Sequence, residues 1–144
     1  MEFKELVTRV RWYQATAIFS ILFALLGFSY NVWRLEVTEH NSNVREASFE
    51  TLLQLAELEQ LVFAAHYDQD PVGGNPRNGW VKVGLIADLS VNCGVEVAAC
   101  AQQLKASWQR NWAAMPEDRA ATESLVAAID DTRLAVLAGL ARLD

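Results

Sequence analysis

The residues best suited to bind a ligand or a partner lie close together in one stretch of the sequence. This stretch supplies an imidazole, a phenol, two carboxylates, a guanidinium and two amides: His66, Tyr67, Asp68, Asp70, Asn75, Arg77 and Asn78. Such groups can hydrogen-bond or ion-pair with a small polar ligand or with a protein surface. A solvated helix end, in which these side chains only pack and cap, is the simpler interpretation and the one we favour.

The same stretch begins like a calcium-binding loop but does not continue as one. Asp68, Asp70 and Gly73 match the first, third and sixth places of such a loop. Val72 then takes a ligand place, and Gly79 takes the last place, where a bidentate glutamate is needed. The sequence contains neither a phosphate-binding glycine loop nor a zinc-protease motif. We therefore expect no bound metal, no cofactor, no catalytic residue and no enzymatic activity.

Cys93 and Cys100 are the two cysteines of the chain. The charges around the N-terminal apolar segment place them in an oxidising compartment, so we predict a disulfide between them. Unbroken helix would separate their Cα atoms by about 10.5 Å, whereas a disulfide requires less than about 7 Å. We therefore expect the helix to break near Gly94. The alternative is a pair of free thiols in a cytoplasmic domain.

An apolar segment near the N-terminus predicts a membrane helix. The 22 residues between Arg11 and Arg34 contain no ionisable side chain other than tyrosine. As a helix they would span about 33 Å, which matches the core of a bilayer. Aromatic residues, which are typical of membrane interfaces, flank the segment: Trp12 and Tyr13, then Tyr30 and Trp33. We predict a tail at residues 1–14 and a transmembrane helix at residues 15–33.

The positive charges near this segment predict its orientation. Lys4, Arg9 and Arg11 precede it, together with the terminal amine, so the tail is expected in the cytoplasm. The residues after the segment are then periplasmic or extracellular, and the chain lies in the inner (plasma) membrane. The alternative is a cleaved signal peptide, since Gly27 and Ser29 form a weak small-x-small site.

Small and polar side chains line one face of the predicted membrane helix. Spacings of three and four residues bring five of them together: Thr16, Ser20, Ala24, Gly27 and Asn31. Small residues let membrane helices approach closely, and Asn31 can add a hydrogen bond between helices. We therefore expect as partners the bilayer and either a second copy, in a homodimer, or another membrane protein. The alternative is that the stripe has no partner, because such residues are common in membrane helices.

A break and an amphipathic helix are expected after the membrane segment. Residues 34–43 hold several weak helix formers and are predicted to form a juxtamembrane hinge. Asn43 with Glu46 then forms a capping box for a helix from Val44 to Tyr67. Its apolar stripe consists of Leu52, Leu55, Leu58, Val62 and Ala65. The stretch Asp68–Gly79, with two prolines and three glycines, is expected to be a loop.

Residues 80–92 are ambiguous, because their apolar residues alternate as in a strand. The sequence offers no second strand to pair with, so we favour a helix that buries Val81, Leu85 and Leu89. Helical spacing continues over Val95–Ala114, and a last helix is expected from Pro116 onward. The predicted class is all-α, with a transmembrane helix and then a bundle of about four helices, residues 44–144, outside the cytoplasm.

The charge of the chain limits its partners. Residues 35–144 hold sixteen Asp/Glu against eight Lys/Arg, within a net charge of −6 for the whole sequence. An acidic domain repels phosphate backbones, so we expect no binding to nucleic acid. We expect an accessory or interaction protein of an envelope complex. The alternative is a ligand-sensing periplasmic domain, which would resemble the helical outer domains of bacterial receptors and would signal through a membrane partner.

Overall fold

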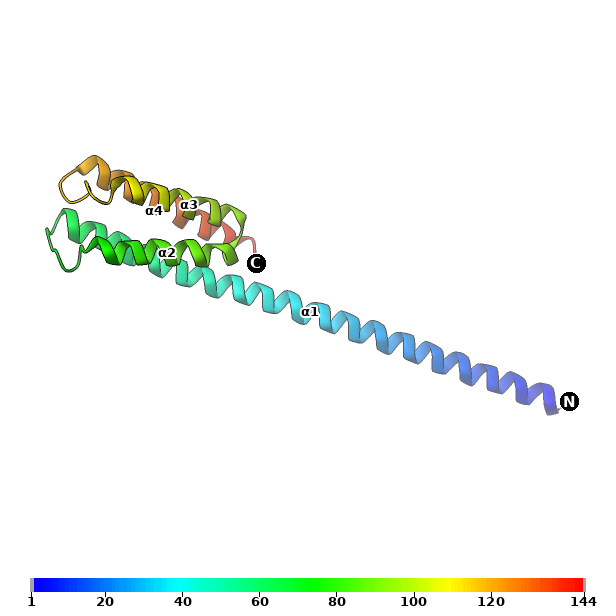
Figure 1. Ribbon diagram of the computed structural model, residues 1–144. Helices are drawn as coiled ribbons and strands as arrows, with labels where there is room; N and C mark the ends of the chain where they lie inside the picture. The colour runs from blue at the N-terminus through cyan, green and yellow to red at the C-terminus, as the bar shows by residue number, and fades with distance from the viewer. Residues whose placement is uncertain (1, 144) are drawn as a thin grey trace. The chain divides into compact units, whose positions relative to one another are not determined.

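The computed structural model describes the backbone of residues 2–143 and the side chains of residue 7 and residues 9–143. These residues form four helices and no strand, so the predicted all-helical class is correct (Figure 1). The helices are α1 (Glu2–His66), α2 (Pro76–Cys93), α3 (Val95–Asn111) and α4 (Arg119–Ala141). The ambiguous residues 80–92 belong to α2, as favoured. Met1 and the Lys4 side chain, which belong to the predicted tail, lie outside the described residues. So does Asp144, the last residue of the predicted outer domain.

The chain divides into two parts, one up to His40 and one from Asn41 onward. The first part belongs to α1, which among the described helices is the one long and apolar enough, by length and composition, to cross a membrane. Its hydroxyl groups bond within the helix. Thr16 Oγ1 donates to the carbonyl of Trp12, and Ser20 Oγ donates to the carbonyl of Thr16, both at 2.8 Å. These bonds satisfy the hydroxyls without water, as an apolar environment requires.

The helix break expected at residues 34–43 is absent, because α1 continues through them. The predicted N-cap at Asn43 is therefore wrong. Weak helix formers cost only about 0.5 kcal/mol each relative to alanine, and none of these ten residues is proline or glycine. Thr38 donates its hydroxyl to the carbonyl of Arg34 at 2.8 Å, inside the helix. This hydroxyl thus bonds along the helix and does not interrupt it.

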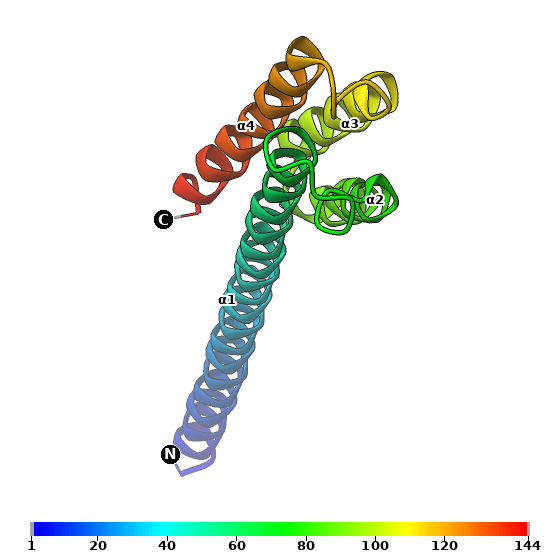
Figure 2. The same ribbon diagram turned by 90° about the vertical axis from the view of Figure 1, so that its left-hand side faces the viewer.

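In the second part, the C-terminal portion of α1 and helices α2, α3 and α4 form an antiparallel bundle in which each helix lies beside the next (Figures 1 and 2). All four helices contribute side chains to one apolar core. Its fully buried members include Leu55, Leu58 and Val62 of α1, Ile86 of α2, Leu104 and Trp108 of α3, and Leu125 and Ile129 of α4. The apolar stripe predicted for α1 therefore forms its buried face.

Helix α2 starts earlier than expected. Asn75 caps it by accepting a hydrogen bond from the backbone N–H of Arg77 at 3.0 Å, and Pro76 occupies the first turn. Proline is favourable there because its nitrogen has no hydrogen to satisfy. The connection between α1 and α2 therefore ends at Asn75, and the predicted loop Asp68–Gly79 is too long.

Helix α2 also turns a different face to the core than expected. Gly79 lies against the indole of Trp108, where an added Cβ would come within 2.1 Å of a ring carbon. This contact turns the Gly79 side of α2 inward. The buried residues are therefore Val83, Ile86, Ala87 and Ser90. Val81 and Leu85 are exposed and Leu89 is half-buried, so the predicted buried face is wrong.

The last two connections differ in length. Gly94 alone separates α2 from α3, with a φ of 120° that favours glycine. The break predicted near this residue is confirmed. Helix α4 begins after Asp118, whose carboxylate accepts a hydrogen bond from the N–H of Ala120 at 2.9 Å. The start predicted at Pro116 is too early, because the aspartate provides the stronger cap.

Candidate functional site

The structure brings three of the seven predicted loop residues to one hollow, of about 510 Å³, between α1, α2 and their connection. Asp68, Asp70 and Asn78 line it, together with Glu57 and Lys82. Lys82 forms an ion pair with Glu57, so these two charges offset each other. Among the described residues, no group of three or more His, Cys, Asp or Glu could hold a metal ion. The hollow thus offers two carboxylates and an amide to a small polar molecule.

The other four predicted residues lie outside this hollow. His66 Nδ1 lies 2.9 Å from the carbonyl oxygen of Met115. The His66 ring meets the Tyr67 ring edge-on, with centroids 4.7 Å apart. Asn75 caps α2, and Arg77 is exposed. Three of the four therefore pack or cap at the ends of helices.

A larger hollow, of about 910 Å³, lies between α1 and the C-terminal half of α2. Its apolar lining comes from Ala47, Phe49, Leu53 and Leu89. Polar side chains, such as Asn92, complete it. The sequence analysis assigned Leu89 to the core and did not predict this hollow, which combines side chains of two helices.

A row of exposed apolar side chains runs along α1 on the side opposite the core. The α1 outer strip, as we name it, consists of Phe49, Leu53, Ala56 and Phe63 of α1 and of Tyr67, the residue that follows its last turn. Phe49 and Tyr67 are 62% and 63% exposed, whereas Leu55 and Leu58 of α1 are fully buried. Helix α1 is thus apolar on two faces, and the bundle covers only one of them.

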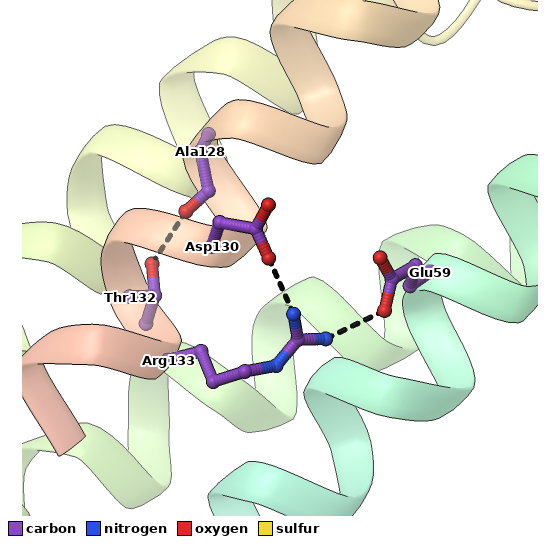
Figure 3. A network of polar contacts seen from close by, with 5 residues as sticks. All are labelled: Glu59, Ala128, Asp130, Thr132 and Arg133. Carbon is purple, nitrogen blue, oxygen red and sulfur yellow. Dashed lines mark hydrogen bonds and ion pairs between the residues drawn. The ribbon is translucent and has the colours of Figure 1, made fainter. Parts of the chain in front are cut away.

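Ion pairs on both sides of the α1 outer strip join α1 to α2 and α4. On one side, Arg133 of α4 binds Glu59 of α1 at 2.6 Å and also pairs with Asp130 of its own helix (Figure 3). On the other side, Lys82 of α2 pairs with Glu57. Glu57 and Glu59, beside the middle of the strip, are therefore paired with the neighbouring helices.

A further ion pair joins α3 to α4 at exposed positions. Arg142 donates a hydrogen bond to Glu96, and this bond, followed by the attraction between the charges, lowers the pKa of the Glu96 carboxyl. The same two causes raise the pKa of Arg142. Because water surrounds both groups, the pair contributes little to stability.

Cys93 and Cys100 are free thiols in the structure, so the predicted disulfide is absent. Cys93 is buried at the end of α2, where Sγ donates to the carbonyl of Leu89 at 3.5 Å and lies 3.7 Å from Thr51 Oγ1. Cys100 is half-buried, more than one turn along α3 from its first residue, Val95. The break between the helices therefore leaves the thiols on separate elements.

The five residues of the predicted membrane-helix stripe are all exposed in α1: Thr16, Ser20, Ala24, Gly27 and Asn31. A Cβ added at Gly27 would meet no atom within 4 Å, so this face is open. The larger apolar residues around the stripe, such as Leu22 and Phe23, are exposed as well. Exposure therefore does not distinguish this face from the others.

No protein-family model, no curated protein and no solved structure matches this chain.

Proposed function

We propose that the protein is a membrane-anchored interaction protein. Helix α1 crosses the inner (plasma) membrane, and the acidic helical domain outside the cytoplasm binds other proteins of the cell envelope. The observation that carries the docking role is the α1 outer strip, which exposes large apolar side chains outside a complete core. Exposed apolar patches of this kind are typical of interaction surfaces. The proposal includes no catalytic step.

The anchor is supported by composition and charge. The segment between Arg11 and Arg34 is apolar, and the basic residues before it favour a cytoplasmic tail. In a background without Cys93 and Cys100, a membrane-impermeant maleimide should label a Gln102→Cys variant in intact cells. It should label a Thr8→Cys variant only after lysis. The opposite pattern would reverse the orientation, and release of the chain by alkaline carbonate would contradict the anchor.

The docking role is supported by the length and the position of the strip. From Phe49 to Tyr67 it extends over about 27 Å of helix. Apolar surface gains about 25 cal/mol per Å² when a partner removes it from water. Glu57 and Glu59, which flank the middle of the strip, are already paired with Lys82 and Arg133 of neighbouring helices. The strip can therefore accept the apolar face of another helix.

A photo-reactive amino acid at Ala56 tests the docking role. Ala56 lies in the strip, and Ala127, equally small and exposed on α4, is the matched control. In membranes we expect a crosslinked product from position 56 and little from position 127. Equal crosslinking at both positions, or none at position 56, would contradict the proposal.

A second candidate function, ligand sensing, is favoured by the hollow that Asp68, Asp70 and Asn78 line. Two carboxylates beside an amide suit a small cation or zwitterion. The melting temperature of the full chain in detergent, measured against a panel of such compounds, should then rise with one of them. The rise should disappear in an Asp68→Asn variant. A melting temperature unchanged across the panel would remove this candidate.

A further inference from the structure

We propose that one half of the bundle opens on its own while the other half stays folded. Figure 1 shows the turn between α2 and α3 at the end of the bundle where α1 enters, and the other two connections at the opposite end. The described core residues form two clusters. The distal cluster, toward those two connections, includes Leu58 and Trp108. The proximal cluster, beside the turn, consists of Cys93, Val97 and Val136. The half around the proximal cluster is the one that opens.

The core stabilises the proximal half less than the distal half. Among the described residues, the distal cluster has thirteen buried members and the proximal cluster has three. Leu52 and Leu140, which pack against the proximal cluster, are only partly buried. The hollow of about 910 Å³ also lies in this half, between α1 and the end of α2. Because apolar burial stabilises in proportion to the area removed from water, the proximal half is the weaker one.

Buried hydroxyl groups interrupt the apolar core between the two clusters. Thr51 of α1, Ser90 of α2 and Thr132 of α4 are fully buried. Along its helix, each lies between residues that belong to or pack against the two clusters. Each hydroxyl donates a hydrogen bond, of 2.7 or 2.8 Å, to a carbonyl of its own helix. These three bonds persist when the helices separate, so they do not oppose opening.

Hydrogen bonds in the distal half join different segments of the chain. Thr122 Oγ1 of α4 donates to the carbonyl of Met115 at 2.9 Å, and His66 Nδ1 of α1 lies 2.9 Å from the same oxygen. Gln69 donates to the carbonyl of Pro116 at 3.0 Å. Met115 is fully buried. Opening this half would break such bonds and expose the larger core, so it costs more free energy.

The contacts between helices in the proximal half are weaker. Thr51 Oγ1 lies 3.7 Å from Cys93 Sγ, and sulfur forms only weak hydrogen bonds. Further contacts lie at exposed positions: Arg142 with Glu96, and Arg45 with the carbonyl of Leu143 at 3.5 Å. Water screens exposed contacts, so they stabilise little. Opening of the proximal half would make the Cys93 thiol accessible while the distal cluster stays packed.

Labelling of thiols in the folded full chain in detergent tests this opening. A Cys100→Ala variant keeps Cys93, which is 7% exposed, as its one thiol. Ala65→Cys, in the background without native cysteines, places the comparison thiol in the distal cluster, at a residue that is 6% exposed. We expect Cys93 to be labelled at least about ten-fold faster, relative to the unfolded chain. Its rate should also depend less on denaturant, because partial opening exposes less surface. Equal rates with equal denaturant dependence would exclude separate opening.

A thiol on α4 distinguishes opening of the proximal half from fraying of α2 alone. Val136→Cys, in the background without native cysteines, replaces a fully buried residue of the proximal cluster. It should be labelled within about three-fold of the Cys93 rate, because one opening exposes both. Labelling of position 136 as slow as that of position 65 would confine the motion to the end of α2 and overturn the proposal.

Two buried valines provide matched variants, since Val136 is 0% and Val83 is 1% exposed. Val136→Ala weakens the proximal cluster and Val83→Ala the distal one, so both should lower the melting temperature. Val136→Ala should speed labelling of Cys93 about ten-fold. Val83→Ala should leave this rate unchanged, because Val83 stays packed while the proximal half is open. Equal acceleration by both variants would mean that the bundle opens as a single unit.

Discussion

The contact between Gly79 and Trp108 determines which face of α2 is buried. The glycine lets the indole ring lie against the backbone of α2, and Trp80 meets the same ring edge-on, with centroids 6.5 Å apart. Sequence periodicity alone could not reveal this, because Val81 and Leu85 also fit one face of a helix. The rotation of α2 depends on a tertiary contact between residues far apart in the sequence.

Replacing this glycine should destabilise the bundle. A Cβ in a Gly79→Ala variant would lie 2.1 Å from one ring carbon of Trp108 and 2.3 Å from another. We expect a loss of about 1–3 kcal/mol in the free energy of unfolding. Gly84→Ala is the control, because its Cβ would meet no atom within 4 Å, and it should stabilise α2 by about 0.5–1 kcal/mol. Denaturant midpoints measure both, and equal shifts would contradict the assigned contact.

Arg133 should stabilise the bundle more than an exposed arginine does. Its side chain is 29% exposed and that of Glu59 is 23% exposed, so Arg133→Met leaves a half-buried carboxylate with one partner fewer. We expect a loss of about 1 kcal/mol, reduced from the buried case by the remaining solvent. Arg119→Met, at an exposed pair with Glu123, should leave the melting temperature unchanged. Equal losses from both variants would contradict the role of the α1–α4 contact.

At the scale of elements, α1 carries two apolar faces with different roles. The sequence analysis identified the buried one, and Leu55, Leu58 and Val62 are indeed in the core. The outer strip was also readable from its spacing, because Phe49, Leu53 and the apolar residues after them repeat at steps of four and three. Only the structure shows which of the two faces the bundle covers.

The two faces of α1 should respond differently to substitution. Leu58→Ala removes a fully buried side chain and should cost about 2–5 kcal/mol. Leu53→Gln lies on the outer strip and should change the free energy of unfolding by no more than about 0.5 kcal/mol. Leu53→Gln should nevertheless lower the yield of crosslinked product from position 56 in membranes. Denaturation of the full chain in detergent and the crosslinking yield measure the two effects. A large loss of stability from Leu53→Gln would place this residue in the core.

The ion pair between Glu96 of α3 and Arg142 predicts that the stability of the fold depends slightly on pH. Arg142 lowers the pKa of Glu96 in the folded chain, so the contact stabilises the fold above the ordinary carboxyl pKa. This contribution is lost as the pH falls through the lowered pKa. Glu96→Gln should therefore lower the melting temperature slightly at neutral pH and leave it unchanged in acid. A difference that persists in acid would contradict an electrostatic origin.

Apart from the buried face of α2 and the disulfide, the errors of the sequence analysis lie at the ends and breaks of elements. Weak helix formers predicted a break at residues 34–43. Each of them costs the helix little, however, and α1 continues through all ten residues. Asn75 and Asp118 were not recognised as caps, which displaced the starts of α2 and α4. The disulfide was inferred from compartment and number of cysteines, neither of which shows whether the thiols meet. Local signals could identify the helices but not their boundaries.

At the scale of the whole molecule, the pattern of apolar residues along the sequence was sufficient to predict the fold class. The apolar N-terminal segment and the amphipathic segments after it predicted one long apolar helix and an all-helical domain, and both are present. The hollows between α1 and α2 could not be predicted, since each requires side chains from two elements in register. Membrane anchoring and docking remain proposals with the tests given above.

The unequal connections of the bundle have a consequence for protein engineering. Only Gly94 connects α2 to α3, so residues added there would force the two helices apart. The connection over residues 67–75 is longer, and Val72 within it is 78% exposed. Exposed loop tips are the sites that best accept inserted sequence. An epitope or fluorescent domain inserted at Val72 would therefore report on the protein in living cells and leave the helical core and the outer strip intact.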